Sequence, residues 1–84
     1  MPKFDLTPCV LVFAGHDPSG GAGIQADIEA IAAQGAHALP IITALTVQDN
    51  NQVAAVHPVA AEVIRAQALA LMACMPIRAL KLGI

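Results

Sequence analysis

The sequence predicts an α/β fold with a mostly parallel sheet. Residues 9–14 form an apolar run, a glycine-rich turn follows at residues 15–23, and a helical pattern spans residues 21–34. An apolar run without polar alternation is typical of a strand covered on both faces, as in a parallel sheet. Residues 39–48 predict a second strand, so the chain begins with a strand–helix–strand unit and a right-handed parallel crossover.

The composition is that of one small, apolar and weakly charged unit. The 84 residues are 57% hydrophobic and 12% charged, with a net charge of −2. Such a chain is too apolar to be disordered and unusually apolar for a small free-standing domain. We therefore expect a piece of a larger protein, or a chain that buries a face against a partner, such as a second copy in a homo-oligomer. The sequence has no cluster of Lys or Arg, so nucleic acid is not an expected partner.

Nothing in the sequence predicts contact with a membrane. The longest stretch without a charged residue, residues 30–48, contains Pro40 and several polar residues. The apolar run after Lys3 is short and differs from a signal peptide. Cys9 and Cys74 lie within apolar runs without metal-ligand spacing, which predicts buried reduced thiols in a cytoplasmic protein.

The glycine-rich turn predicts a ligand loop. Gly20, Gly21 and Gly23 permit positive φ and leave no Cβ in the way of a ligand. The free N–H groups of the following helix point back at this loop and favour an anion or a polar ring. Ser19 is the expected N-cap of that helix. The alternative is a tight strand-to-helix turn without a ligand.

The first helix carries one acidic residue in an unusual place. Ile24, Ile28 and Ile31 form an apolar stripe, and Gly35 is the expected stop. Asp27 lies at the edge of that stripe. Two interpretations stay open: the helix N-terminal dipole favours the carboxylate, or the carboxylate faces the ligand of the loop.

Gln48 is expected at the carboxyl edge of the sheet. Along residues 39–48, the even-numbered side chains from Ile42 onward point to one side, Gln48 among them. Parallel strands end at the same edge, and ligands of open α/β folds bind outside it. Gln48 is therefore predicted to lie beside the glycine loop, followed by a turn at residues 49–51.

The second half of the chain predicts a short strand or flap at residues 52–56, a helix and a last strand. Pro58 is expected at the first position of the helix, which runs to residue 74 or 75 before Pro76. The last strand, residues 77–84, has an unpaired edge and carries Lys81, whose amine is expected in solvent. The apolar stripe of the helix is expected to include Val59, Val63 and Leu69.

Three common site patterns are absent or incomplete. Gly15 and Gly20 have the spacing of a phosphate-binding Walker A loop, but Gly21 stands where that loop needs Lys. A dinucleotide fingerprint can be matched to residues 21–26, yet its first glycine should follow the strand directly. Gly15 holds that place, and Asp17 then stands where the second glycine belongs, so this is the weaker interpretation. The three histidines lack metal-ligand spacing, and no Ser–His–Asp set is present. We therefore expect neither a metal site nor catalytic residues in this chain.

Residues 13–27, FAGHDPSGGAGIQAD, closely resemble the N-terminal signature of hydroxymethylpyrimidine/phosphomethylpyrimidine kinase. Residues 42–49 resemble its next block, and residues 81–84 its third. This enzyme of thiamine biosynthesis belongs to the ribokinase-like superfamily. The resemblance covers nearly the whole chain, from about Val10 to Ile84.

The resemblance implies the N-terminal part of a three-layer α/β/α ribokinase-like fold. It implies ATP-dependent phosphorylation of 4-amino-5-hydroxymethyl-2-methylpyrimidine and its monophosphate. Residues 1–84 would supply the pyrimidine-binding part of one kinase domain, without its downstream ATP-binding part. ATP and Mg²⁺ are expected for the full-length enzyme and neither for this segment alone, which is expected to be inactive by itself.

The family signature also assigns substrate-binding positions. They are Gly15, Ala22, Asp27, Gln48 and Ile84. Gln48 would hydrogen-bond the aminopyrimidine edge, because its amide offers a donor and an acceptor. Asp27 would hold the ring or hydroxymethyl side, and Ala22 and Ile84 would pack on the ring. The alternatives are a nucleotide-binding module and a non-catalytic interaction half-domain that pairs with another chain.

Overall fold

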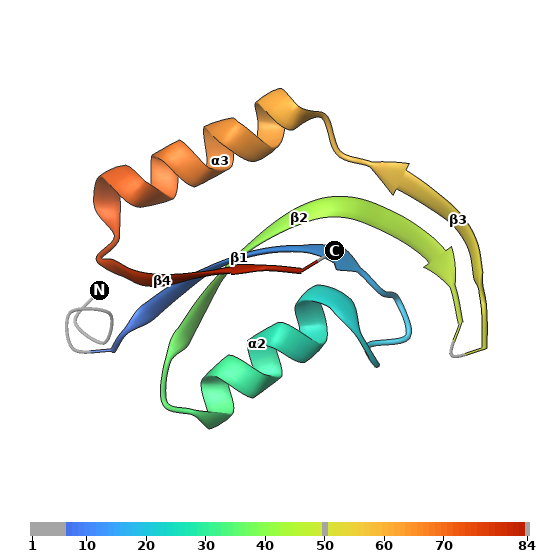
Figure 1. Cartoon of the computed structure of the whole chain (residues 1–84), viewed down its shortest axis with the longest axis horizontal. Coiled ribbons are helices and arrows are strands. Elements are labelled where there is room, and N and C mark those ends of the chain that lie inside the picture. The colour runs from blue at the N-terminus through green and yellow to red at the C-terminus, as the bar shows by residue number, and fades with distance from the viewer. Residues whose placement is uncertain (1–6, 50, 84) are drawn as a thin grey trace.

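The computed structural model describes residues 7–49 and 51–83, which form a four-stranded sheet with one helix on each face (Figure 1). The strands β2 and β4 run parallel to β1, and β3 runs antiparallel to β2, in the order β3-β2-β1-β4. The predicted α/β fold with a mostly parallel sheet is confirmed. The elements are β1 (Cys9–His16), α2 (Gly23–Ala33), β2 (His37–Gln48), β3 (Val53–Pro58), α3 (Ala61–Cys74) and β4 (Ile77–Leu82).

Strand β1 contributes to two hydrophobic cores, one on each face of the sheet. Leu11 and Ile41 are each 1% exposed and lie in the core beneath α3. Val12 and Ala14 belong to the opposite core, together with Ile24 of α2. Because both faces of β1 are covered, its side chains are apolar without alternation.

The start of α2 differs from the prediction, and its end agrees. The helix begins at Gly23, and its N-cap residue Ala22 makes no side-chain capping bond. Ser19 is therefore not the N-cap; its hydroxyl donates to Asp17 Oδ1 instead, at 2.7 Å. Gly35 follows the helix with φ of 82°, the left-handed conformation that ends many helices.

The predicted helix start at Pro58 is wrong because strand pairing continues through it. His57 lies opposite Leu45 and Pro58 opposite Ala44 in the antiparallel β2–β3 ladder. The short strand or flap expected at residues 52–56 is this strand β3. Helix α3 therefore begins only at Ala61.

The predicted apolar stripe of α3 is also wrong. Val63 and Leu69 are 45% and 52% exposed, and Val59 precedes the helix. An alanine- and leucine-rich helix has apolar residues on several sides, so periodicity alone did not select the buried one. The side chains that pack on the sheet from this part of the chain are Ile64, Ala68, Leu71 and Met75.

The two cysteines are both free thiols in different surroundings. Cys9 is buried, as predicted, whereas Cys74 at the end of α3 is exposed, so the prediction of burial is wrong there. Within residues 7–49 and 51–83, no helix is long and apolar enough to cross a membrane.

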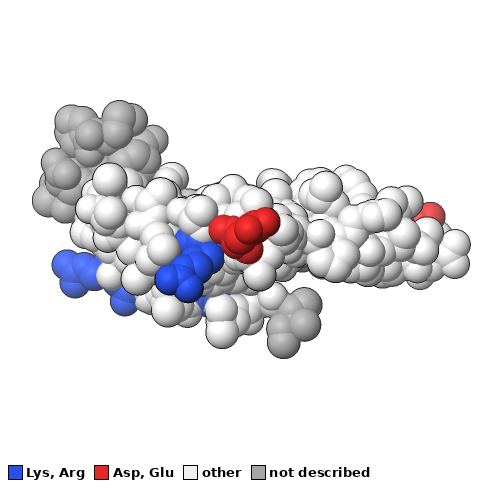
Figure 2. Space-filling view, turned by 90° about the horizontal axis from the view of Figure 1, so that it is seen from above, with Lys and Arg blue, Asp and Glu red and all other residues white. Residues whose placement is uncertain are grey.

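Strand β4 lies at one edge of the described sheet and exposes large apolar side chains. Leu80 and Leu82 are 64% and 74% exposed, and Met72 of α3 is 58% exposed. The face seen in Figure 2 carries few charged side chains. An open strand edge beside exposed apolar groups favours association between chains.

We predict that the 84-residue chain self-associates and that the double change Leu80→Lys with Leu82→Lys reduces this association. Charged side chains on an edge strand oppose pairing with another strand. Sedimentation velocity over a concentration series measures the effect. Gln67→Lys, at an exposed polar position of α3, is the matched control and should leave association unchanged. A parent chain that sediments as one monomeric species would contradict the prediction.

Candidate functional site

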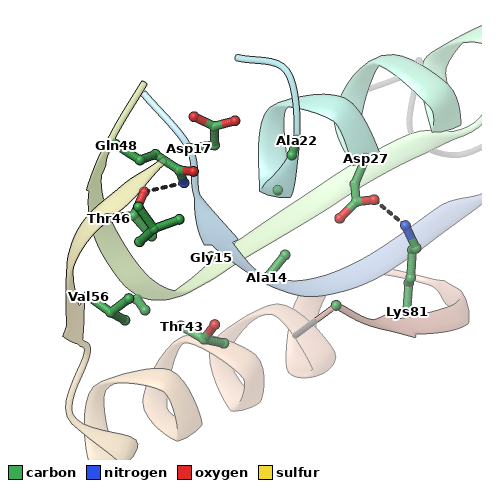
Figure 3. Close-up of a pocket in the computed structure, with 14 residues that line it drawn as sticks. Ala14, Gly15, Asp17, Ala22, Asp27, Thr43, Thr46, Gln48, Val56 and Lys81 are labelled. Carbon is green, nitrogen blue, oxygen red and sulfur yellow. Dashed lines mark hydrogen bonds and ion pairs between the residues drawn. The ribbon is translucent and has the colours of Figure 1, made fainter. Parts of the chain in front are cut away.

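A cavity of about 730 Å³ lies at the carboxyl ends of β1 and β2 (Figure 3). Its walls come from the glycine loop, α2, both strand ends, β3 and residues 81 and 83. Four of the predicted substrate-binding residues line it together: Gly15, Ala22, Asp27 and Gln48. The fifth, Ile84, lies outside the described residues. A binding role for all five stays a prediction.

The glycine loop folds back so closely that one of its positions has no room for a side chain. Gly23 has φ of 66°, and a Cβ there would lie 2.5 Å from the carbonyl oxygen of Gly15. His16 and Gly23 also form an isolated antiparallel bridge. The first turn of α2 is thereby held against the end of β1, where it borders the cavity.

Asp17 fixes the turn between β1 and α2. Its Oδ1 accepts hydrogen bonds from the Ser19 backbone N–H at 2.8 Å and from the Ser19 hydroxyl at 2.7 Å. Both bonds lower the pKa of the Asp17 carboxyl from its usual value, and the bond from the hydroxyl has the larger effect. From the sequence, Asp17 was noted as a mismatch to the dinucleotide fingerprint and as part of the family signature, and no structural role in the turn was predicted. The Asp-x-Ser spacing is the signal for this turn, because Asp side chains bond backbone N–H groups two residues on.

Asp27 of α2 lines the cavity on the side away from Gln48 and forms an ion pair with Lys81 of β4 (Figure 3). Asp27 is 8% exposed, whereas the Lys81 side chain is 52% exposed, so the pair joins a buried carboxylate to a half-exposed lysine. Asp27 lies beyond the first turn of α2, which contains no acidic residue, so the helix-dipole interpretation loses its support. The Lys81 side chain is half exposed, as expected of a lysine near a strand end, but its ion pair with Asp27 was not predicted. Its register opposite Val12 places it on the α2 face of the sheet.

Gln48 and Thr46 form a hydrogen-bonded pair on the opposite side of the cavity (Figure 3). Gln48 Nε2 donates to Thr46 Oγ1 at 2.6 Å, and Thr46 Oγ1 donates to the carbonyl oxygen of His16 at 2.7 Å. The ends of β1 and β2 are thereby joined through side chains. Gln48 was predicted at this edge from the sequence, whereas Thr46 was given no role.

The charges around the cavity suit a small polar ring better than a triphosphate. Its lining holds two carboxylates, Asp17 and Asp27, against one cation, Lys81. Both carboxylates are already bonded, to Ser19 and Lys81 respectively. In the described part of the chain, no three His, Cys, Asp or Glu side chains come together as a metal site. The lining residues therefore do not fit an ATP–Mg²⁺ complex.

Solved structures of small-molecule kinases share this architecture. The crystal structure of phosphomethylpyrimidine kinase from Clostridium difficile 630 matches with a TM-score of 0.86 and 40% identity, over 93% of this chain and 34% of that one. Bacillus subtilis pyridoxal kinase matches with a TM-score of 0.83 and 31% identity, over 93% of this chain and 31% of that one. The fold class is that of the ribokinase-like kinases.

The sequence comparisons then define the family. A family model described as phosphomethylpyrimidine kinase matches residues 17–84. The hydroxymethylpyrimidine/phosphomethylpyrimidine kinase of Rhizobium meliloti (strain 1021) is 41% identical over 78 residues, which are 93% of this chain. The chain belongs to the phosphomethylpyrimidine kinase family, as its signature predicted. It spans 29% of the length of the Rhizobium relative.

We predict that Gly23→Ala destabilises the fold and that Gly21→Ala is tolerated. At position 23 the added Cβ would meet a backbone oxygen in a left-handed conformation, which costs about 1–3 kcal/mol or more. At Gly21 the nearest atoms to a Cβ lie 3.7 Å and 3.9 Å away. Urea unfolding followed by circular dichroism measures both free energies, since the chain contains no Trp or Tyr. Equal losses in the two variants would contradict the close approach of Gly23 to Gly15.

We predict that Asp17→Asn reduces the loss of stability in acid. The pKa of Asp17 is lower in the folded chain than in the unfolded one, so its stabilising effect is complete above about pH 4. The effect is lost as the pH falls through the lowered pKa. Urea midpoints measured from neutral to acid pH should change less in Asp17→Asn than in the parent chain. The same is expected of Ser19→Ala, which removes the hydroxyl that bonds Asp17. If the urea midpoints of both variants fell with pH as they do in the parent chain, the Asp17 carboxyl would not contribute to the pH dependence of stability.

Proposed function

We propose that this chain forms the pyrimidine-binding part of a kinase that phosphorylates 4-amino-5-hydroxymethyl-2-methylpyrimidine and its monophosphate. The observation that carries the proposal is that Gly15, Ala22, Asp27 and Gln48 line one cavity together, in a chain of the phosphomethylpyrimidine kinase family. Residues 1–84 would be one part of a single kinase domain. Thiamine biosynthesis in the cytoplasm is the proposed setting.

The polar groups of the cavity complement the proposed substrate. A 4-aminopyrimidine edge presents an exocyclic N–H donor beside a ring nitrogen acceptor, and the Gln48 amide offers the matching acceptor and donor. The Asp27 carboxylate only accepts hydrogen bonds, which suits the hydroxyl of the hydroxymethyl group. Gly15 and Ala22 leave room for a flat ring because neither has a side chain longer than a methyl group.

ATP would supply the phosphoryl group from outside this cavity. Phosphoryl transfer depends mainly on positioning and on stabilising charge. The residues of the cavity bind and orient the acceptor, whereas the nucleotide and Mg²⁺ would be held by the remaining part of the kinase. This division agrees with the 29% of the Rhizobium relative that the chain spans.

Pyridoxal is the second candidate substrate. Bacillus subtilis pyridoxal kinase is similar in fold and 31% identical. A pyridine ring, however, presents one ring nitrogen without a neighbouring amino donor, so it would use only half of the Gln48 amide. The pyrimidine is therefore favoured by the hydrogen-bonding groups of the cavity.

A chimaeric kinase tests the proposal directly. The 78 matching residues of the Rhizobium kinase are replaced with those of this chain. We predict that the chimaera phosphorylates the pyrimidine with ATP and prefers it to pyridoxal, whereas the 84-residue chain alone yields no product. A chimaera that folds and binds ATP but leaves the pyrimidine unphosphorylated would overturn the proposal.

The variant Gln48→Ala in the chimaera tests the site itself. Loss of the paired hydrogen bonds should cost about 1–3 kcal/mol of binding, or about a five- to hundredfold higher KM for the pyrimidine. The KM for ATP should stay unchanged. Gln67→Ala, on exposed α3, is the matched control. An unchanged pyrimidine KM, or equal losses for both substrates, would show that Gln48 is structural.

A further inference from the structure

Three polar groups form a directed chain of hydrogen bonds at the rim of the cavity. It runs from the Gln48 amide to the Thr46 hydroxyl at 2.6 Å (Figure 3), and from that hydroxyl to the carbonyl oxygen of His16 at 2.7 Å. Thr46 and Gln48 both line the cavity, and both are partly buried.

The direction of this chain is fixed by the number of protons available. A backbone carbonyl oxygen can only accept, and a threonine hydroxyl has one proton to donate. Because Thr46 donates that proton to His16, its oxygen can only accept from Gln48. The Gln48 side chain must therefore turn its NH₂ group, and not its oxygen, toward Thr46.

A glutamine amide can otherwise rotate by half a turn and exchange its oxygen and nitrogen. In the rotated state, Oε1 of Gln48 would face the Thr46 hydroxyl oxygen. The single Thr46 proton could then serve either His16 or Gln48, and the other oxygen would lose its donor. The observed orientation leaves Oε1 and the second N–H of Gln48 for a ligand.

We infer that Thr46 is a positioning residue that sets the substrate specificity of Gln48. Through it, the cavity selects a ring edge with a nitrogen acceptor beside an exocyclic N–H donor. It rejects the reversed edge, in which a ring N–H lies beside a carbonyl oxygen. This inference rests on the proposed function, because it requires that Gln48 contacts the pyrimidine.

Two ligands that differ in this edge alone test the inference. They are 4-amino-5-hydroxymethyl-2-methylpyrimidine and its 4-oxo analogue, whose ring N–H and carbonyl reverse the pattern. Titration calorimetry with the full chain gives the ratio of the two affinities, and kcat/KM in the chimaera gives the same ratio independently. A mismatched hydrogen-bonded pair should weaken the 4-oxo analogue about ten- to hundredfold in the parent.

Thr46→Val and Thr46→Ser separate the hydroxyl from the shape of the side chain. Valine keeps the branched shape but frees the Gln48 amide to rotate, so the affinity ratio should fall toward equal binding. Serine keeps the hydroxyl and should retain the parent ratio. Thr7→Val makes the same chemical change at a position that does not line the cavity, and should also retain it.

The outcomes distinguish this inference from the proposed function. A parent ratio that survives in Thr46→Val, or a parent that prefers the 4-oxo analogue, overturns the role of Thr46 alone. Equal weakening of both ligands in Thr46→Val would show a purely structural role and also overturn it. If the parent chain binds neither ligand and the parent chimaera phosphorylates neither, the proposed function fails as well.

Discussion

The parallel pairing of β1 with both β2 and β4 is the constraint on which the site depends. Parallel neighbours end at the same edge, so the chain leaves β1 and β2 side by side at the cavity. The same pairing places Lys81 opposite Val12, within reach of Asp27. The ion pair of Asp27 with Lys81 and the bond from Thr46 to His16 thus come from strand order and register, whereas Gln48 and Thr46 are neighbours on one side of β2.

Sequence patterns within short segments correctly predicted those parts of the fold whose conformation depends on neighbouring residues. The apolar run of β1, the crossover through α2 and the glycine stop at Gly35 follow from burial and backbone conformation within short segments. Gln48 was placed correctly at the sheet edge because a parallel crossover determines where the second strand ends. The helix pattern had left a ligand-facing Asp27 as one of two interpretations, and the family signature favoured it and added Ala22; both line the same cavity.

Several of the failed predictions depend on distant contacts, whereas the N-cap expected at Ser19 failed through a local bond to Asp17. His57 and Pro58 satisfy the rule for a helix start, but pairing with β2 keeps them extended. The buried side of α3 is selected by the sheet beneath it, which the periodicity of an alanine-rich helix does not reveal. The ion pair of Lys81 was not predicted because its partner lies 54 residues away in the sequence. Each of these distant contacts required knowledge of which strand lies next to which.

The separation of Asp27 and Lys81 along the chain links the cavity to the order in which the fold assembles. The glycine loop and the end of β2 meet as soon as the first strand–helix–strand unit forms, a comparatively local event. The cation of the cavity arrives only when β4 docks, which closes a loop of more than fifty residues. A molecule that contacts both Gln48 and the Asp27–Lys81 pair therefore binds the fully docked state alone. By mass action, such a ligand holds the last strand in place as it occupies the cavity.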